Sequence, residues 1–97
     1  NMGQSSNDTF PSAMHIACAT AVKDDLLPAL GRLQQVLDNW AREWWDVIKI
    51  GRTHLMDATP IRMGQVFSGY AAQAQMSISR GKNALDTLSS NLPIGGT

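Results

Sequence analysis

The stretch LLPALGRLQQVLDNWAREWWDV, residues 26–47, decides the fold that this sequence predicts. Its large apolar residues recur at alternating steps of four and three along the chain: Leu26, Leu30, Leu33, Leu37, Trp40, Trp44 and Val47. This spacing places them along one side of an α-helix. So regular an apolar row is typical of a helix that packs against other helices. Trp40 and Trp44 belong to this row, which favours a packing role over a stacking platform for a ligand.

A shorter helix is expected before this one. Asn7 or Asp8 can cap its N-terminus, and Pro11 would fall in its first turn, where a missing N–H is tolerated. The helical spacing predicts one buried stripe, made of Phe10, Met14, Ala17 or Cys18, and Ala21. The charged residues 23–25 and then Pro28 predict a break or kink near residues 24–28.

Residues 48–62 lose the helical period and contain Gly51 and Pro60, which predicts a loop with room for short extended pieces. A last helix is expected from about Met63 to Ser90. One side of it presents Met63, Phe67, Tyr70, Ala74, Ile78, Gly81, Leu85 and Leu88. Its many small residues allow close approach on more than one face, and a three-helix monomer would leave such faces uncovered. The sequence therefore predicts an all-α fold of long helices, in which either assembly into an oligomeric helical bundle or missing flanking helices would cover the remaining faces.

Composition excludes several classes of protein. The 97 residues allow one domain, and eight Lys plus Arg balance eight Asp plus Glu, so a nucleic-acid or anionic membrane partner is disfavoured. The single cysteine, Cys18, permits neither a disulfide framework nor a Cys-based zinc site, and its apolar neighbours predict a buried thiol in a reducing compartment. Without a run of about 18 apolar residues, we expect a soluble protein.

The first polar cluster is Gln4-Ser5-Ser6-Asn7-Asp8, at the start of the first predicted helix. Hydroxyls, an amide and unpaired backbone N–H groups at the positive end of a helix dipole suit a carboxylate or a phosphate. The alternative is that these side chains only cap the helix.

The second polar cluster is Arg52-Thr53-His54, with Asp57 and Thr59 nearby. Histidine ionises near neutral pH, so a loop histidine beside a hydroxyl and a cation can act as an acid, a base or an anion ligand. The alternative is an ordinary surface histidine. His15, between the apolar Met14 and Ile16, is assigned no role.

Read as motifs, both clusters resemble blocks of class II fumarases, within the fumarase/aspartase superfamily. The first block is residues 1–17, NMGQSSNDTFPSAMHIA, and the second is residues 49–60, KIGRTHLMDATP, followed by Gly64-Gln65. Gly95-Gly96-Thr97 looks like the start of a third block. The triplet Ser5-Ser6-Asn7 and the pair Thr53-His54 resemble fumarases rather than aspartate ammonia-lyases.

The resemblance implies reversible hydration of fumarate to L-malate, with no metal or organic cofactor, by a homotetramer with a bundle of long central helices. It implies that Ser5, Ser6 and Asn7 hold a substrate carboxylate. Thr53 would donate a hydrogen bond, and His54 would assist proton transfer or order the catalytic water. Because one active site in this family takes segments from different subunits, the two clusters are expected to serve different sites of the tetramer.

The resemblance also implies that this chain is an internal fragment, residues 1–97, at the start of the family's central helical domain. The mobile loop that supplies the proton-abstracting serine has no match here, so we expect the 97 residues alone not to catalyse hydration. Two alternatives stay open: a non-catalytic helical oligomerisation module or truncated product, and a related lyase that releases fumarate from another compound. The expected location is the cytoplasm, or the mitochondrial matrix in a eukaryote.

Overall fold

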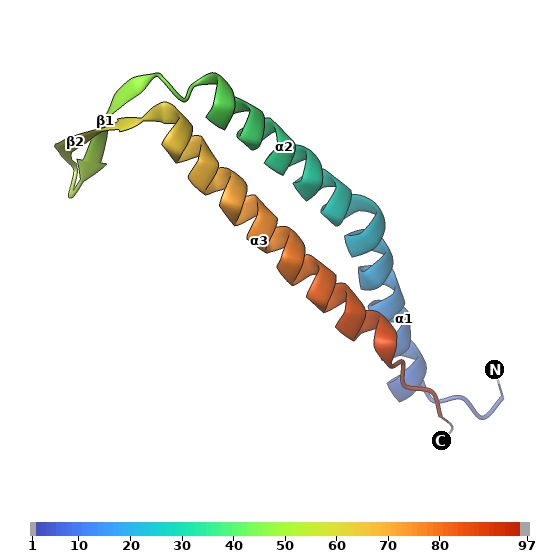
Figure 1. Cartoon of the computed structure of the whole chain (residues 1–97). Helices are drawn as coiled ribbons and strands as arrows, with labels where there is room; N and C mark the ends of the chain where they lie inside the picture. Colours follow the sequence, from blue (N-terminus) through green and yellow to red (C-terminus); the bar gives the residue numbers. More distant parts are fainter. Residues whose placement is uncertain (1, 96–97) are drawn as a thin grey trace. The chain divides into compact units, whose positions relative to one another are not determined.

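A computed structural model describes residues 2–95 of the chain. Its elements are α1 (Ser6–Ala21), the π-helical turn η1 (Val22–Leu26), α2 (Leu27–Glu43), β1 (Ile48–Thr53), β2 (Met56–Arg62) and α3 (Met63–Ser90) (Figure 1). Long helices dominate, which confirms the predicted fold class. The chain forms two compact units, one of residues 1–29 with 78–97 and one of residues 30–77.

Helix α1 begins earlier than the sequence predicted. Ser5 is the N-cap, and its side chain accepts a hydrogen bond from the Asn7 N–H at 3.2 Å. The Ser5 carbonyl also accepts from the Thr9 hydroxyl at 3.1 Å. The prediction of Asn7 or Asp8 as the cap was wrong because these bonds fix the start of the helix at Ser6, so Pro11 lies inside the helix beyond its first turn.

The predicted break near residues 24–28 is a π-helical turn, and the chain stays helical through it. The Leu27 N–H donates to the Val22 carbonyl, five residues earlier. Pro28 lacks an N–H and would clash with the preceding turn of a regular α-helix, and π-bulges are one of the ways in which helices absorb such a defect. The irregularity therefore lies at Val22–Leu26, just before the proline.

Within residues 30–77, α2 packs on α3 through a small core. Leu37 of α2 contacts Ala71 and Ala74 of α3, and Phe67 packs against this cluster. The Trp40 and Trp44 rings stack with their centroids 5.5 Å apart, and the Phe67 ring centroid lies 5.2 Å from that of Trp44. These contacts confirm the packing role of both tryptophans, although α2 ends at Glu43 rather than at Val47.

Residues 48–62 form a β-hairpin, whereas the sequence predicted a loop with room for short extended pieces. The strands are antiparallel, and Ile48 pairs with Arg62 and Thr53 with Met56. The register shifts between Ile50 and Arg52, and a Cβ on the intervening Gly51 would lie 2.6 Å from the Thr59 carbonyl oxygen. Pro60 is tolerated because each strand of a two-stranded sheet has one free edge.

Helix α3 has the bounds that the sequence predicted, and Ala74 and Ile78 of its predicted face are buried. Ala71 is buried as well, whereas Tyr70 is 49% exposed. At the start of α3, a Cβ on Gly64 would clash with the Ala41 carbonyl oxygen and lie 2.7 Å from Trp45 Cα. Gly64 therefore lets α3 begin directly against the end of α2.

Many large apolar side chains of the described residues remain exposed. Phe10 is 68% exposed and Met14 52%, and α1 contains no buried residue. Cys18 is exposed as well. The predictions of a buried stripe on α1 and of a buried Cys18 thiol are therefore wrong for this chain, because nothing within residues 2–95 covers that helix closely enough. No helix among residues 2–95 is long and apolar enough to cross a membrane.

Candidate functional site

The first candidate cluster lies at the N-terminus of α1. The Ser5 carbonyl accepts from the Asp8 N–H at 3.2 Å and from the Thr9 N–H at 3.1 Å, and the Ser5 hydroxyl accepts from the Asn7 N–H. Three of the first backbone donors are therefore already engaged. Because a hydroxyl that accepts can still donate its own hydrogen, Ser5 keeps one donor for a ligand.

Ser6 and Asn7 are exposed at the same turn, and their side chains make no hydrogen bond to another residue in the described range 2–95. Together with Ser5 they present two hydroxyls and one amide to a bound group. Such donors at the positive end of a helix suit a carboxylate. Side chains supply most of this donor set, since the cap occupies most of the backbone N–H groups.

Residues near the C-terminus of the chain lie beside the first half of α1. The Ser12 hydroxyl donates to the Pro93 carbonyl. A Cβ on Gly95 would lie 2.7 Å from Asp8 Oδ2, so a larger residue there would require the Asp8 side chain to shift. The first glycine of the third motif thus lies beside the first turn of α1, while Gly96 and Thr97 lie outside the described residues.

The second candidate cluster is the tip of the hairpin. Thr53 ends β1, and His54 and Leu55 form a two-residue turn before Met56 begins β2. His54 has φ 53° and Leu55 φ 62°, so both adopt the left-handed region. This is the signature of a type I′ turn, for which Asn-Gly is the preferred sequence. A histidine followed by a leucine in this conformation stores backbone strain, which is a recurrent feature of functional sites.

The neighbours of His54 are polar and open to solvent. Arg52 Nε lies 3.6 Å from Asp57 Oδ1, and both side chains are mostly exposed. The guanidinium of Arg52 is therefore paired across the hairpin, and Thr59 lies opposite Gly51, further from the tip. The His54 side chain is exposed and makes no hydrogen bond within residues 2–95, so its imidazole can meet a group from outside this chain.

The two clusters belong to different units of the chain, Ser5, Ser6 and Asn7 to one and Thr53 and His54 to the other. Within each unit the predicted residues lie together. Among residues 2–95, no group of three His, Cys, Asp or Glu side chains could hold a metal ion. A separate cavity of about 420 Å³ opens against Trp45, lined also by Asp38, Ala41, Arg42 and Ser68.

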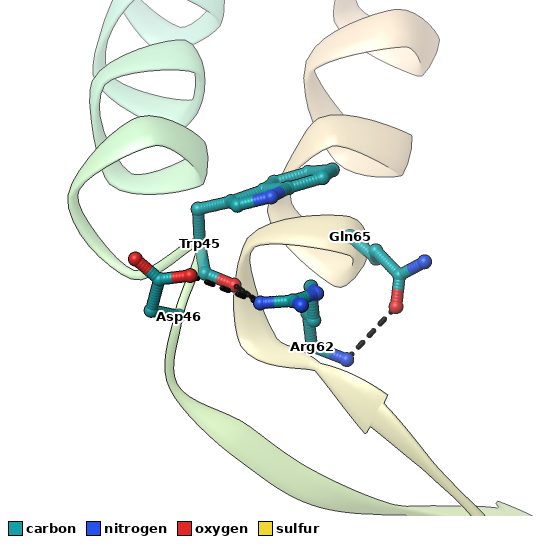
Figure 2. A network of polar contacts seen from close by, with 4 residues as sticks. All are labelled: Trp45, Asp46, Arg62 and Gln65. Atoms are coloured by element: carbon teal, nitrogen blue, oxygen red, sulfur yellow. Dashed lines mark hydrogen bonds and ion pairs between the residues drawn. The ribbon is translucent and has the colours of Figure 1, made fainter.

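The sequence did not point to the junction at the base of the hairpin, where Arg62 bonds the end of α2. Arg62 Nη1 donates to the Trp45 carbonyl at 3.2 Å and to Asp46 Oδ1 at 3.0 Å (Figure 2). The Gln65 side chain accepts from the Arg62 N–H at 2.8 Å. Gln65 stands three residues after Arg62, the spacing of a capping box, and that signal alone was visible in the sequence.

A family model described as lyase matches residues 1–97, the full length of the chain. The chain belongs to this lyase family. It is similar to a protein named fumarate hydratase class II from Caulobacter vibrioides, with 58% identity over 97 residues. A protein of the same name from Corynebacterium glutamicum is 54% identical over the same length. The chain spans about a fifth of the length of these curated relatives: 21% and 20%, respectively.

Solved structures of the lyase family show the same fold. The recombinant class II fumarase from Schistosoma mansoni matches with a TM-score of 0.85 and 44% identity, over 91% of this chain and 18% of that one. A fumarate lyase:delta crystallin from Brucella melitensis matches with a TM-score of 0.81 and 38% identity, over 91% of this chain and 20% of that one.

Proposed function

We propose that this chain is part of a fumarate hydratase, which adds water reversibly to fumarate to give L-malate. The observation on which the proposal rests is the 58% identity to a fumarate hydratase class II over all 97 residues, a span that includes both polar clusters. The geometry agrees with it, since one cluster offers donors for a carboxylate and the other an exposed histidine.

The turn at the start of α1 is proposed to bind a carboxylate of the substrate. Ser5, Ser6 and Asn7 supply hydroxyl and amide donors there, and the helix dipole adds favourable electrostatic energy. Charged acceptors make hydrogen bonds about twice as strong as neutral ones, which favours an ionised carboxylate over a neutral ligand. This cluster therefore fixes the orientation of the dicarboxylate.

The hairpin tip is proposed to act on the reacting carbons. Hydration adds the oxygen of water to one alkene carbon and a proton to the other. His54 would accept a proton from the attacking water, or hold that water in line, while Thr53 donates a hydrogen bond. The base that abstracts the proton in the reverse reaction is proposed to come from a part of the enzyme outside these 97 residues.

The experiment is a substrate assay on the full-length enzyme. Loss of the fumarate absorbance and formation of L-malate are measured, with aspartate and argininosuccinate offered separately. The proposal expects conversion of fumarate to L-malate and no release of fumarate from the other two compounds. Release of fumarate from either of them, without hydration, would replace the hydratase with a related lyase.

We also propose that the full-length enzyme is a homotetramer. The exposed apolar side chains of α1 and α2, among them Phe10 at 68% and Leu33 at 49%, support association, because soluble monomers rarely expose so much apolar surface. In such an assembly the two clusters would contribute to different active sites. The cytoplasmic location, or the mitochondrial matrix in a eukaryote, stays a prediction.

A further inference from the structure

We propose that Arg62 is a positioning residue for His54, acting from the base of the hairpin that presents this histidine. The inference rests on the proposed function, since it concerns the orientation of the His54 imidazole during hydration. The bonds of Arg62 lie at the base of the hairpin, away from the tip where Thr53 and His54 are proposed to act. The arginine nearest the reactive tip, Arg52, pairs across the strands, whereas Arg62 ties the hairpin to α2.

Arg62 is held from two sides. Its N–H donates to the Gln65 side chain in the first turn of α3, and its guanidinium donates to the Trp45 carbonyl and to Asp46 just after α2 (Figure 2). A cation beside a carbonyl that follows a helix, here that of Trp45, also complements the negative end of the helix dipole. The Arg62 side chain thus joins the last residue of β2 to the residues just after α2, while its backbone N–H joins the same residue to the start of α3.

Backbone hydrogen bonds join the same segments independently of the Arg62 side chain. The Met63 N–H donates to the Val47 carbonyl at 2.8 Å, and the Gly64 N–H donates to the Trp44 carbonyl at 3.0 Å. Two such bonds set the spacing of the segments but permit rocking about the line that joins them. The Arg62 side chain adds an attachment at Trp45 and Asp46, from a different atom, and so opposes that rocking.

A small rotation at the base of the hairpin produces a larger displacement at its tip, where His54 lies. Strand β1 has 6 residues, so at a rise of about 3.3 Å per residue its tip lies about 17 Å from its base. A rotation of about 3° at the base then moves His54 by about 1 Å, and a misplacement of about 1 Å can lower a rate about 100-fold. A weak surface bond at the base can therefore matter more for catalysis than for stability.

The test uses the full-length enzyme with Arg62→Ala, Arg62→Lys and the control Arg32→Ala, an exposed arginine of α2. Arg62→Ala should lower kcat about tenfold or more with little change in KM, Arg62→Lys should restore part of the loss, and Arg32→Ala should match the wild type. In a His54→Asn background, Arg62→Ala should produce no further loss, because the residue it positions is already gone. An equal loss in both backgrounds, or no loss in either, overturns the proposal.

Hydrogen exchange separates this inference from the proposed function. Arg62→Ala should speed amide exchange across residues 48–62, and Arg32→Ala should leave it unchanged. If the wild type fails to hydrate fumarate, the proposed function fails and the positioning role fails with it. If the wild type is active and His54→Asn is fully active, the hydratase stands, and the roles of His54 and Arg62 fail. Faster exchange in Arg62→Ala would still establish the structural attachment. If Arg62→Ala does not fold, Asp46→Ala removes one of the two side-chain bonds at a side chain that is 96% exposed, so packing is undisturbed. Unchanged exchange and unchanged kcat in that variant overturn the attachment itself.

Discussion

His54 and Leu55 adopt a backbone conformation that glycine would adopt at lower cost. Leu55 has φ 62°, and its side chain is fully exposed, so no contact within residues 2–95 repays the strain. Left-handed backbone costs an L-residue about 1–2 kcal/mol. We propose that this turn carries the strain because of the direction that it gives the His54 side chain.

Replacing Leu55 with glycine should therefore stabilise the protein. The relief of strain exceeds the entropic cost of glycine, which is about 0.5–1 kcal/mol, so the free energy of unfolding should rise by about 0.5–1 kcal/mol. Leu55→Ala is the matched control, because alanine removes the side chain and keeps the Cβ. Urea unfolding of the full-length enzyme measures both. Equal stabilities of the two variants would show that the backbone is not strained.

The cap of α1 shows how local competition limits what a sequence can predict. Ser5, Asn7 and Asp8 are all good N-cap residues, so their identities alone do not choose among them. The choice follows from bonds that only coordinates reveal, with the Thr9 hydroxyl and the Asp8 and Thr9 N–H groups converging on the Ser5 carbonyl. The positions of the substrate-binding candidates were predicted correctly as a helix start, and the cap itself was not.

Alanine substitutions at two glycines of α3 should change the free energy of unfolding in opposite directions. Gly64 faces the backbone of Ala41 and Trp45, which cannot move aside, so Gly64→Ala should lower the free energy of unfolding by about 2–3 kcal/mol. Gly69 has nothing within 4 Å of its ideal Cβ, so Gly69→Ala should raise it by about 0.5–1 kcal/mol through helix propensity. Thermal unfolding of the two variants, side by side, checks the pair. A harmless Gly64→Ala would mean that α3 does not begin against the end of α2.

The sequence predicted the long helices and allowed short extended pieces in residues 48–62, but it did not predict that these pieces pair as a hairpin. Helix α3 follows from a long apolar period, and its bounds at Met63 and Ser90 agree with the sequence. In residues 48–62 the two strongest local signals, Gly51 and Pro60, both oppose a strand, and the turn lacks Asn-Gly. The hairpin exists because Gly51 absorbs a register shift and Pro60 has a free edge, which are properties of the pairing rather than of either strand.

The exposed apolar faces belong to the assembly that we propose. Leu33 is 49% exposed on α2, and a charge there should weaken association of the full-length enzyme. Leu33→Asp should shift the sedimentation of the enzyme toward smaller species. Gln35→Asp, on the opposite side of the same helix, is the control and should sediment as the wild type does. Identical sedimentation of both variants would remove this face of α2 from the assembly.

The most direct test of the central claim is the turnover of fumarate by the full-length enzyme with His54→Asn. Asparagine keeps a polar side chain of similar reach but cannot exchange a proton near neutral pH. If His54 takes part in proton transfer, kcat should fall on the order of 100-fold while the enzyme remains folded. Unchanged kcat in a folded His54→Asn enzyme would contradict the claim that the hairpin tip takes part in the chemistry.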